Sequence, residues 1–203
     1  NAYGEYNARY GQVISGGGDV NGDGYDDILV GVEQNFSYRG KTVVYLGSED
    51  GLDNTSFKEI FGTNRFGDNV EFFGDLNDDG LDDFIVCNDP SNSLVSIKLF
   101  SGYTGNHSQV LWSESFSADA YLAITSGVDV SGNGDLRVII GNYRTGANTG
   151  SFDIYDPLKY STRYYSGANN EDLYGYSVSV SGDLNGDGYD DLAVGSPGND
   201  SYA

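Results

Sequence analysis

Short runs of hydrophobic residues recur along the chain, and each is bounded by glycine or polar residues. Four of them directly follow a stretch rich in aspartate and glycine: Ile28–Val30, Phe84–Val86, Val138–Ile140 and Leu192–Val194. Runs this short and rich in branched residues are typical of strands that are buried on both faces. No stretch combines a helical period with capping residues. The pattern therefore predicts an all-β protein.

More strands are predicted on either side of each hydrophobic run. The preceding segments, such as Tyr10–Gly17 and Tyr174–Gly182, alternate apolar and small polar residues. Third strands are expected at Thr42–Leu46, Leu94–Phe100 and Ser151–Tyr155, and fourth strands at Phe57–Phe61, Val110–Phe116 and Thr162–Tyr165. A repeated unit of four short strands is the pattern of a β-propeller blade.

The unit recurs at an almost constant spacing. The four acidic stretches read GDVNGDGYDDILVG, GDLNDDGLDDFIVC, VDVSGNGDLRVIIG and GDLNGDGYDDLAVG, and their leading aspartates are Asp19, Asp75, Asp129 and Asp183. We expect blades at about residues 1–62, 63–117, 118–170 and 171–203, with the last blade incomplete. These are about three and a half blades, whereas propellers close with roughly four to eight. The rest of the propeller is expected from the same polypeptide or from another chain.

Three of the acidic stretches share the nine-position pattern D-x-N-x-D-G-x-x-D. Positions 1, 3, 5 and 9 offer carboxylate or amide oxygens, and position 7 offers a main-chain carbonyl. The glycine at position 6 permits the reversal of the chain that turns this carbonyl inward. Calcium takes six to eight such oxygens, and a set without nitrogen or sulfur favours it over zinc or copper. The predicted ligands are Asp19, Asn21, Asp23, Tyr25 and Asp27; Asp75, Asn77, Asp79, Leu81 and Asp83; and Asp183, Asn185, Asp187, Tyr189 and Asp191.

Two other interpretations of these loops fit less well. An EF-hand needs an acidic ligand at position 12, where this chain has Val30, Val86 and Val194. Plain Asn-Gly or Asp-Gly turns do not require acids at positions 1, 5 and 9 in three copies. The sequence therefore predicts three calcium sites.

The remaining loop departs from the pattern. It has Asp129, Ser131 and Asn133 at positions 1, 3 and 5, and Arg137 in place of the acid at position 9. We predict that this loop holds no ion and hypothesise that Arg137 pairs with Asp129. The aspartates at position 8 of the other loops are expected to be solvated charges rather than ligands; they are Asp26, Asp82 and Asp190.

An aromatic–glycine pair stands nine residues before three of the leading aspartates: Tyr10-Gly11, Phe66-Gly67 and Tyr174-Gly175. With Val194-Gly195-Ser196-Pro197 and the acidic loops, these pairs resemble the FG-GAP repeat family, which builds the integrin α-subunit β-propeller. The resemblance covers essentially the whole chain. It implies a calcium loop between the first two strands of a blade, seven blades in a complete domain, and a ligand-binding face opposite the calcium loops. The family includes integrins, bacterial and fungal secreted proteins and a mushroom lectin, so its fold does not fix the ligand.

On the implied ligand face lie the loops that follow the second strand of each blade. Two of these loops carry a tyrosine–arginine pair, Tyr38-Arg39 and Tyr143-Arg144. Tyrosine and arginine are enriched where proteins recognise other surfaces. We therefore predict these four residues as ligand contacts.

The net charge and the remaining candidate residues argue against several classes of function. A net charge of −21, from 31 acidic and 10 basic residues, disfavours nucleic acids and anionic membrane surfaces, and no apolar run approaches the roughly 18 residues of a membrane helix. The single His107 and the single Cys87 lie in no catalytic motif, so no enzyme activity is expected. Acceptor sequences for glycosylation occur at Asn35, Asn54, Asn106 and Asn199, about as many as chance gives in a chain rich in Asn, Ser and Thr.

The sequence thus predicts an extracellular, calcium-binding β-propeller module for adhesion or recognition of protein or glycan ligands. Three alternatives stay open: a carbohydrate-binding lectin, a propeller accessory to an extracellular enzyme, and a structural subunit of an extracellular filament or surface assembly. The expected partners are a protein or glycan ligand and further blades, with no nucleic acid and no direct membrane insertion.

Overall fold

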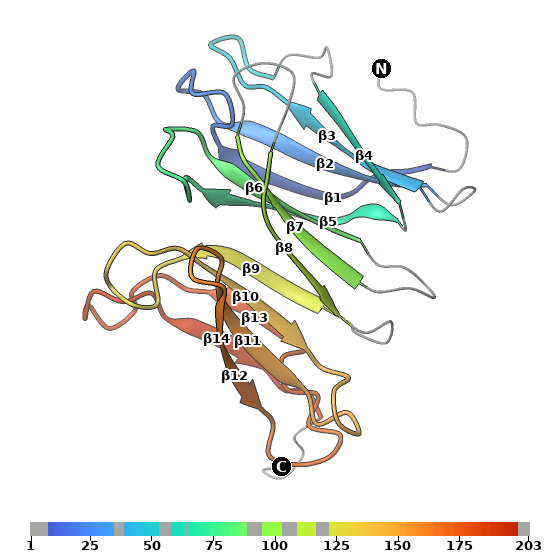
Figure 1. Cartoon of the computed structure of the whole chain (residues 1–203), viewed down its shortest axis with the longest axis vertical. Coiled ribbons are helices and arrows are strands. Elements are labelled where there is room, and N and C mark those ends of the chain that lie inside the picture. The colour runs from blue at the N-terminus through green and yellow to red at the C-terminus, as the bar shows by residue number, and fades with distance from the viewer. Residues whose placement is uncertain are drawn as a thin grey trace. The chain divides into compact units, whose positions relative to one another are not determined.

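The computed structural model describes residues 8–34, 39–52, 58–63, 65–88, 95–102, 109–116 and 122–198. Within these residues all regular structure consists of strands, and no helix occurs. The strands form antiparallel sheets, three with four strands and a last one with two (Figure 1). The predicted all-β class is confirmed, and the sheets form a partial propeller that is not closed.

Each sheet is a meander in which strands pair in chain order. The first contains β1 (Ala8–Gly18), β2 (Asp27–Gln34), β3 (Arg39–Tyr45) and β4 (Lys58–Thr63). The second contains β5 (Phe66–Gly74), β6 (Asp83–Asn88), β7 (Val95–Phe100) and β8 (Val110–Phe116). The third contains β9 (Leu122–Val128), β10 (Arg137–Asn142), β11 (Ser151–Asp156) and β12 (Ser161–Ser166), and the last contains β13 (Ser177–Val180) and β14 (Leu192–Gly195). The predicted short hydrophobic runs form the centres of β2, β6, β10 and β14.

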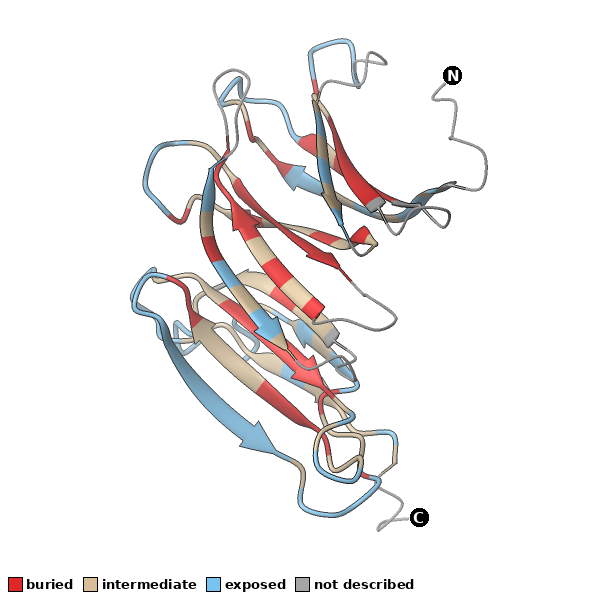
Figure 2. Cartoon of the chain, turned by 45° about the vertical axis from the view of Figure 1, so that its right-hand side comes forward, coloured by how far each residue is buried: buried red, intermediate tan, exposed pale blue. Residues whose placement is uncertain are grey.

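The chain divides into two compact units, Asn1–Ala118 and Asp119–Ala203. The first unit holds the first two sheets, and the second unit holds the third sheet and the two-stranded sheet. Within each unit a core cluster lies between the two sheets. The central strands carry apolar side chains on both faces, and a separate buried cluster of Val30, Val32 and Val43 lies on the other face of the first sheet. The core of the first unit includes Val20, Leu29, Val44, Val70 and Phe84. By contrast, β12 is exposed along its whole length (Figure 2).

The aromatic–glycine pairs fix how two sheets meet inside a unit. A Cβ added at Gly62 would lie 2.2 Å from the ring of Phe66, and one added at Gly40 would lie 1.9 Å from its carbonyl oxygen. A Cβ added at Gly31 would lie 2.1 Å from the carbonyl oxygen of Gly67. The second unit repeats these contacts with Tyr174 and Gly175 against Gly150, Gly167 and Gly141. The pair therefore docks the second sheet and the last sheet on glycines of the sheet that precedes each in its unit, where backbones approach closely.

Candidate metal centre

The first acidic loop, which joins β1 to β2, is folded around the carboxylate of Asp19. One oxygen of Asp19 accepts hydrogen bonds from the backbone N–H groups of Gly22 (2.7 Å) and Asp23 (3.2 Å), and the other accepts one from Gly24 (2.7 Å). The N–H of Tyr25 donates to the Asp23 carboxylate at 3.0 Å. The positive φ of 88° at Gly24 makes the reversal possible. The acidic side chains thus hold the loop in shape by accepting hydrogen bonds from the N–H groups of its own backbone.

The acid at position 9 is buried at the base of the loop. The carboxylate of Asp27 accepts hydrogen bonds from the N–H groups of Val20 and Gly47, both at 2.8 Å. It therefore ties the start of the loop to the segment that follows β3. The second loop repeats this arrangement with Asp83, Leu76 and Gly102, at 2.9 Å for both bonds.

The loops hold like charges close together. Burial raises the pKa of Asp27, and the negative charges of Asp19 and Asp23 raise it further. Burial likewise raises the pKa of Asp83 to about 6, with the charges of Asp79 and Asp75 adding to the shift. A cation in either loop would relieve this repulsion.

The chemistry of the donor set fits a hard cation, since each loop offers three carboxylates and one amide and no nitrogen or sulfur ligand. Among the described residues, no three His, Cys, Asp or Glu side chains converge closely enough to enclose a metal ion. The acids instead bind backbone N–H groups, and Asn21 donates to Asp23 at 2.8 Å on the exposed side of the loop. The assignment of ligands at positions 1, 3, 5, 7 and 9 therefore stays a prediction.

The fourth loop, between β13 and β14, has the same internal geometry. The Asp183 carboxylate accepts hydrogen bonds from Gly186 (2.7 Å), Asp187 (3.1 Å) and Gly188 (2.8 Å). These bonds, that of Gly188 most of all, lower the pKa of Asp183. Asp191 accepts from the N–H of Leu184 at 2.8 Å, as its counterparts do in the first two loops.

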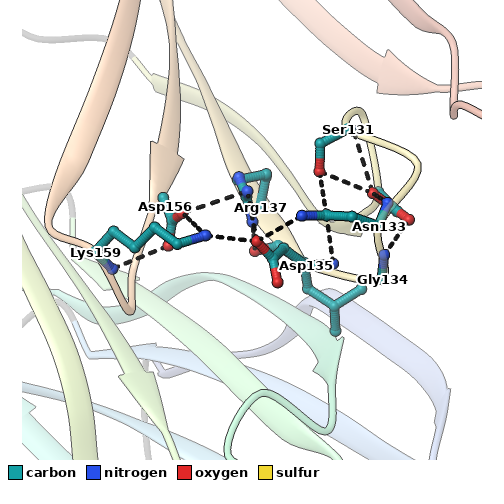
Figure 3. Close-up of polar contacts among 9 residues, drawn as sticks. Ser131, Asn133, Gly134, Asp135, Arg137, Asp156 and Lys159 are labelled. Atoms are coloured by element: carbon teal, nitrogen blue, oxygen red, sulfur yellow. Dashed lines mark hydrogen bonds and ion pairs between the residues drawn. The ribbon is translucent and has the colours of Figure 1, made fainter.

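The third loop, between β9 and β10, contains a network of ion pairs instead (Figure 3). The guanidinium of Arg137 lies 3.3 Å from the carboxylates of both Asp135 and Asp156. The ammonium of Lys159 lies 2.5 Å from Asp135 and 3.3 Å from Asp156. The hypothesis that Arg137 pairs with Asp129 is therefore wrong: the Asp129 carboxylate accepts backbone hydrogen bonds within its own loop, including one from Gly134 at 2.6 Å.

A proline explains why the partner of position 9 changes in the third loop. The pairing of β10 with β11 places Pro157 where Gly47 and Gly102 stand in the first two sheets. Proline has no N–H to donate, so an aspartate at position 9 would lose that bond. Arg137 instead reaches Asp156, the residue before the proline, and two protein cations stand among the acids of this loop.

The position-8 aspartates are not all solvated. The carboxylate of Asp82 accepts a hydrogen bond from the N–H of Asp19 at 2.8 Å, and the N–H of Asp82 donates to the carbonyl oxygen of Asp19 at 2.9 Å. Asp190 makes the same two contacts with Asp129, at 2.9 and 3.0 Å. The expectation of a solvated charge is wrong for Asp82 and Asp190, which connect the loops of the two sheets within each unit. Asp26 is exposed, as expected.

A second contact between loops also has no counterpart in the predictions. A Cβ added at Gly22 would lie 2.8 Å from the Leu81 side chain, and one added at Gly132 would lie 2.9 Å from the Tyr189 ring. The bulky residue at position 7 of one loop thus covers the glycine at position 4 of the preceding loop. The repeated pairing of a small residue at position 4 with a large one at position 7 is the sequence signal that could have shown this contact.

The predicted ligand contacts are only partly within the described residues. The Tyr143 and Tyr176 rings lie 4.7 Å apart, and the Arg144 guanidinium lies 5.9 Å from the centre of the Tyr143 ring. Tyr143 and Arg144 follow the C-terminal end of β10, at the opposite end of the strand from the acidic loop, and Tyr176 directly precedes β13. Tyr38, the Arg39 side chain, His107 and the four glycosylation acceptors lie outside the described residues.

Two further observations bear on chemistry. Cys87 is free and buried, and burial raises the pKa of its thiol well above its ordinary value, so the reactive thiolate is disfavoured. In the part of the chain that the structure describes, no helix has the length and hydropathy to cross a membrane.

Together, the meandering four-stranded sheets and the acidic loop between their first two strands define a repeat protein of the β-propeller class. Sequence comparison specifies the repeat: residues 19–86 match the FG-GAP-like repeat, and residues 174–203 match the FG-GAP repeat. The chain is an FG-GAP repeat, integrin α-like protein.

Among its relatives are integrin α chains. It is 33% identical over 88 residues to integrin alpha-PS3 of Drosophila melanogaster, a match that covers 39% of this chain and 8% of the relative. It is 31% identical over 169 residues to integrin alpha-8 of Gallus gallus, covering 72% and 16% respectively. It is 26% identical over 211 residues to integrin alpha pat-2 of Caenorhabditis elegans, covering 88% and 17%. The chain thus spans less than a fifth of the length of these relatives.

Proposed function

We propose that the chain is an extracellular, calcium-binding β-propeller module for adhesion or recognition. The observation that carries the calcium proposal is the buried aspartate at position 9, represented by Asp27 and Asp83, whose ionisation is opposed by burial and by the acids at positions 1 and 5. A bound divalent ion would supply the positive charge that offsets both effects. The acidic residues would then rigidify the loop through their existing backbone hydrogen bonds.

The first, second and fourth loops are proposed to bind calcium, whereas the third loop, between β9 and β10, is not. Asp19, Asn21, Asp23 and Asp27, with the Tyr25 carbonyl, would hold the ion of the first loop, and the equivalent residues of the second and fourth loops would hold theirs. In the third loop, Arg137 and Lys159 already lie among the acids. A divalent ion would meet their repulsion, and this loop also lacks the acids that the other three loops have at positions 5 and 9.

Calorimetric titration of chelator-treated protein with calcium tests this assignment. We expect three bound ions and a melting temperature that rises by many degrees, because an ion that binds only the folded state stabilises it. Asp23→Asn, Asp79→Asn and Asp187→Asn should each weaken one site. The matched control is Asn133→Asp, which restores the acid at position 5 of the third loop but should add no site. A melting curve unchanged by excess chelator would contradict the proposal.

For recognition, likeness to integrin α chains favours a protein ligand. Tyr143 and Arg144 are the proposed contacts, since the pair lies at the opposite end of β10 from the acidic loop and Arg144 is exposed. Parallel screens against extracellular-matrix proteins and a glycan array would test the ligand class. Arg144→Ala should weaken binding, while Arg163→Ala, at an exposed arginine on β12, serves as the control. Binding to glycans alone would favour the lectin alternative.

The proposal includes no catalytic step. The buried, protonated thiol of Cys87 is poorly suited to be a nucleophile, and the clustered acids are assigned to the loops. A propeller of this kind acts by presenting a rigid surface.

A further inference from the structure

The third and fourth loops, both in the second unit, are joined through Asp190. Its carboxylate accepts the backbone N–H of Asp129 at 2.9 Å, and its own N–H donates to the carbonyl oxygen of Asp129 at 3.0 Å. The preceding residue, Tyr189, covers Gly132 of the third loop, where an added Cβ would lie 2.9 Å from the tyrosine ring. Two consecutive residues of the fourth loop are thus held by the third loop, one by hydrogen bonds and one by packing.

These two residues lie among the proposed calcium ligands of the fourth loop. The carbonyl of Tyr189 and the carboxylate of Asp191 are the predicted ligands at positions 7 and 9, and Asp190 stands directly between them. The Asp191 carboxylate also accepts the N–H of Leu184 at 2.8 Å, which ties it to the start of its own loop. The placement of two predicted ligands therefore depends on a residue whose partner belongs to the third loop.

The third loop is itself held in shape by protein cations. The Lys159 ammonium and the Arg137 guanidinium both contact the carboxylate of Asp135 (Figure 3). Asp135 also accepts a hydrogen bond from the Asn133 side chain at 3.0 Å, and the N–H of Asn133 donates to the Asp129 carboxylate at 3.2 Å. A continuous path of contacts thus leads from the two cations to the residue that the fourth loop engages.

The first unit has the same connection between loops but a different support. Its second loop engages the first loop through the same pair of hydrogen bonds. The first loop, however, has Tyr25 and Asp27 where the third loop has Asp135 and Arg137. The first loop is a proposed calcium site, so a bound ion would be the counterpart of the protein cations. The support in the second unit is therefore independent of calcium.

We propose that the third loop pre-orders the fourth loop for its calcium ion, with Asp190 as the positioning residue. This inference rests on the calcium function proposed above for the fourth loop. The apparent affinity of a site falls with the fraction of molecules in the binding-competent conformation. A support that keeps the fourth loop ordered before the ion arrives therefore raises its affinity. The third loop thus contributes to calcium binding without holding an ion.

Calorimetric calcium titration tests the role of Asp190. Asp23→Asn and Asp79→Asn weaken the first two sites, so the tightest binding event of this parent chain reports the fourth. Adding Asp190→Ala should weaken that event about tenfold, because the N–H of Asp129 loses a charged acceptor and the loop is ordered in fewer molecules. Asp190→Asn keeps an acceptor oxygen without the charge and should retain most of the affinity.

A second variant separates ordering from simple electrostatics, because the two predict opposite signs. Lys159 lines one pocket together with Tyr189 of the fourth loop, so the loss of its charge in Lys159→Met should by itself strengthen calcium binding. Loosening of the third loop should instead weaken binding, by about threefold. Arg163 lines the same pocket, and Arg163→Met is the matched control. It removes an equal charge, leaves the contacts to Asp135 in place and should not weaken binding.

Amide hydrogen exchange in chelator measures the order of the fourth loop without any ion. The N–H groups of Gly186 and Gly188 donate to the Asp183 carboxylate. They should exchange faster in the two variants that weaken binding, Asp190→Ala and Lys159→Met, than in the parent chain and the control. This measurement does not depend on whether the loop binds calcium.

Two results would overturn the inference. One is equal calcium affinity of Asp190→Ala and Asp190→Asn, which would leave only an effect of charge. The other is a Lys159→Met chain that binds calcium as tightly as Arg163→Met, with unchanged exchange in the fourth loop. A parent chain that binds no calcium would instead contradict the proposed function. The exchange rates in chelator would then still decide whether the third loop orders the fourth.

Discussion

The carboxylate of Asp82 accepts the backbone N–H of Asp19 at 2.8 Å, although the two residues belong to different sheets and lie 63 positions apart in the chain. The return bond, from the N–H of Asp82 to the carbonyl oxygen of Asp19, makes a two-point connection between consecutive loops. Asp190 and Asp129 repeat it in the second unit. A residue beside the predicted metal ligands therefore has a role in joining sheets.

Replacing Asp82 by alanine should destabilise the first unit by about 1–3 kcal/mol, because the N–H of Asp19 loses a charged acceptor in a half-buried site. Urea denaturation of a dilute sample in chelator measures this change. Asp26→Ala is the matched control and should stay within about 0.5 kcal/mol of the wild type. Equal effects of the two substitutions would show that the Asp82 connection contributes nothing beyond its own loop.

Asp27→Ala should be more damaging, by about 2–5 kcal/mol in the absence of calcium. The substitution leaves two buried N–H groups, those of Val20 and Gly47, without an acceptor. Asp27→Asn retains one acceptor oxygen and should cost less. Measuring both in chelator separates the hydrogen bonds from any loss of a bound ion; a neutral effect of Asp27→Ala would refute the buried structural role.

Gly31→Ala should destabilise the first unit by about 3 kcal/mol, the upper end of the usual cost of overpacking. The new Cβ would lie 2.1 Å from the backbone carbonyl oxygen of Gly67, which cannot move without separating the sheets. Gly16→Ala on β1 is the control, since its Cβ would meet only ordinary contacts at 3.7 Å. Thermal melting of the two variants should therefore differ clearly.

The ion pairs of the third loop should respond to acid. Hydrogen bonds from Lys159 above all, and then from Asn133 and Arg137, lower the pKa of Asp135 to about 2. Since this folded-state pKa lies below the ordinary value of about 3.9, the contribution of Asp135 to stability is complete above about pH 4 and is lost as the pH falls towards 2.

Carbon-detected NMR titration of the Asp135 carboxyl group measures this pKa directly. Lys159→Met should move it up towards the ordinary value, and added salt should do the same to a lesser extent. Arg163→Met removes an equal positive charge on β12 and should leave the pKa of Asp135 unchanged. An Asp135 that titrates normally in the wild-type chain would show that the ion pairs of Figure 3 are not formed in solution.

Local patterns were enough to predict the strands and the loops. The hydrophobic runs, the alternating segments and the acidic repeats each act over a few residues, so their consequences follow from period and composition. The glycine at position 6 of each loop, with φ between 82° and 88°, is a local requirement of the same kind. The observed strands begin or end within a few residues of the predicted ones for this reason.

Contacts between sheets could not be inferred in the same way. The pairing of Arg137 with Asp156 rather than Asp129 depends on Pro157, which follows β11 directly and whose missing N–H becomes relevant only once β11 lies beside β10. Likewise, Leu81 and Tyr189 were predicted for their carbonyl groups, while their side chains cover glycines of the preceding loop. A repeat motif shows what each unit contains, but not which side of it meets its neighbour.

Asp26 and Asp82 illustrate what the sequence determines and what the tertiary structure adds. Both stand at position 8 of almost identical loops, so the sequence by itself determined one local conformation for both: a turn built on its own carboxylates and followed by a buried strand. Only the tertiary structure made them different. In the first unit the loop after β1 lies against the loop of Asp82, so the N–H of Asp19 is within hydrogen-bond distance of the Asp82 carboxylate. Asp26 remains exposed. The physical reason is that a hydrogen bond acts over about 3 Å, whatever the separation of its partners along the chain.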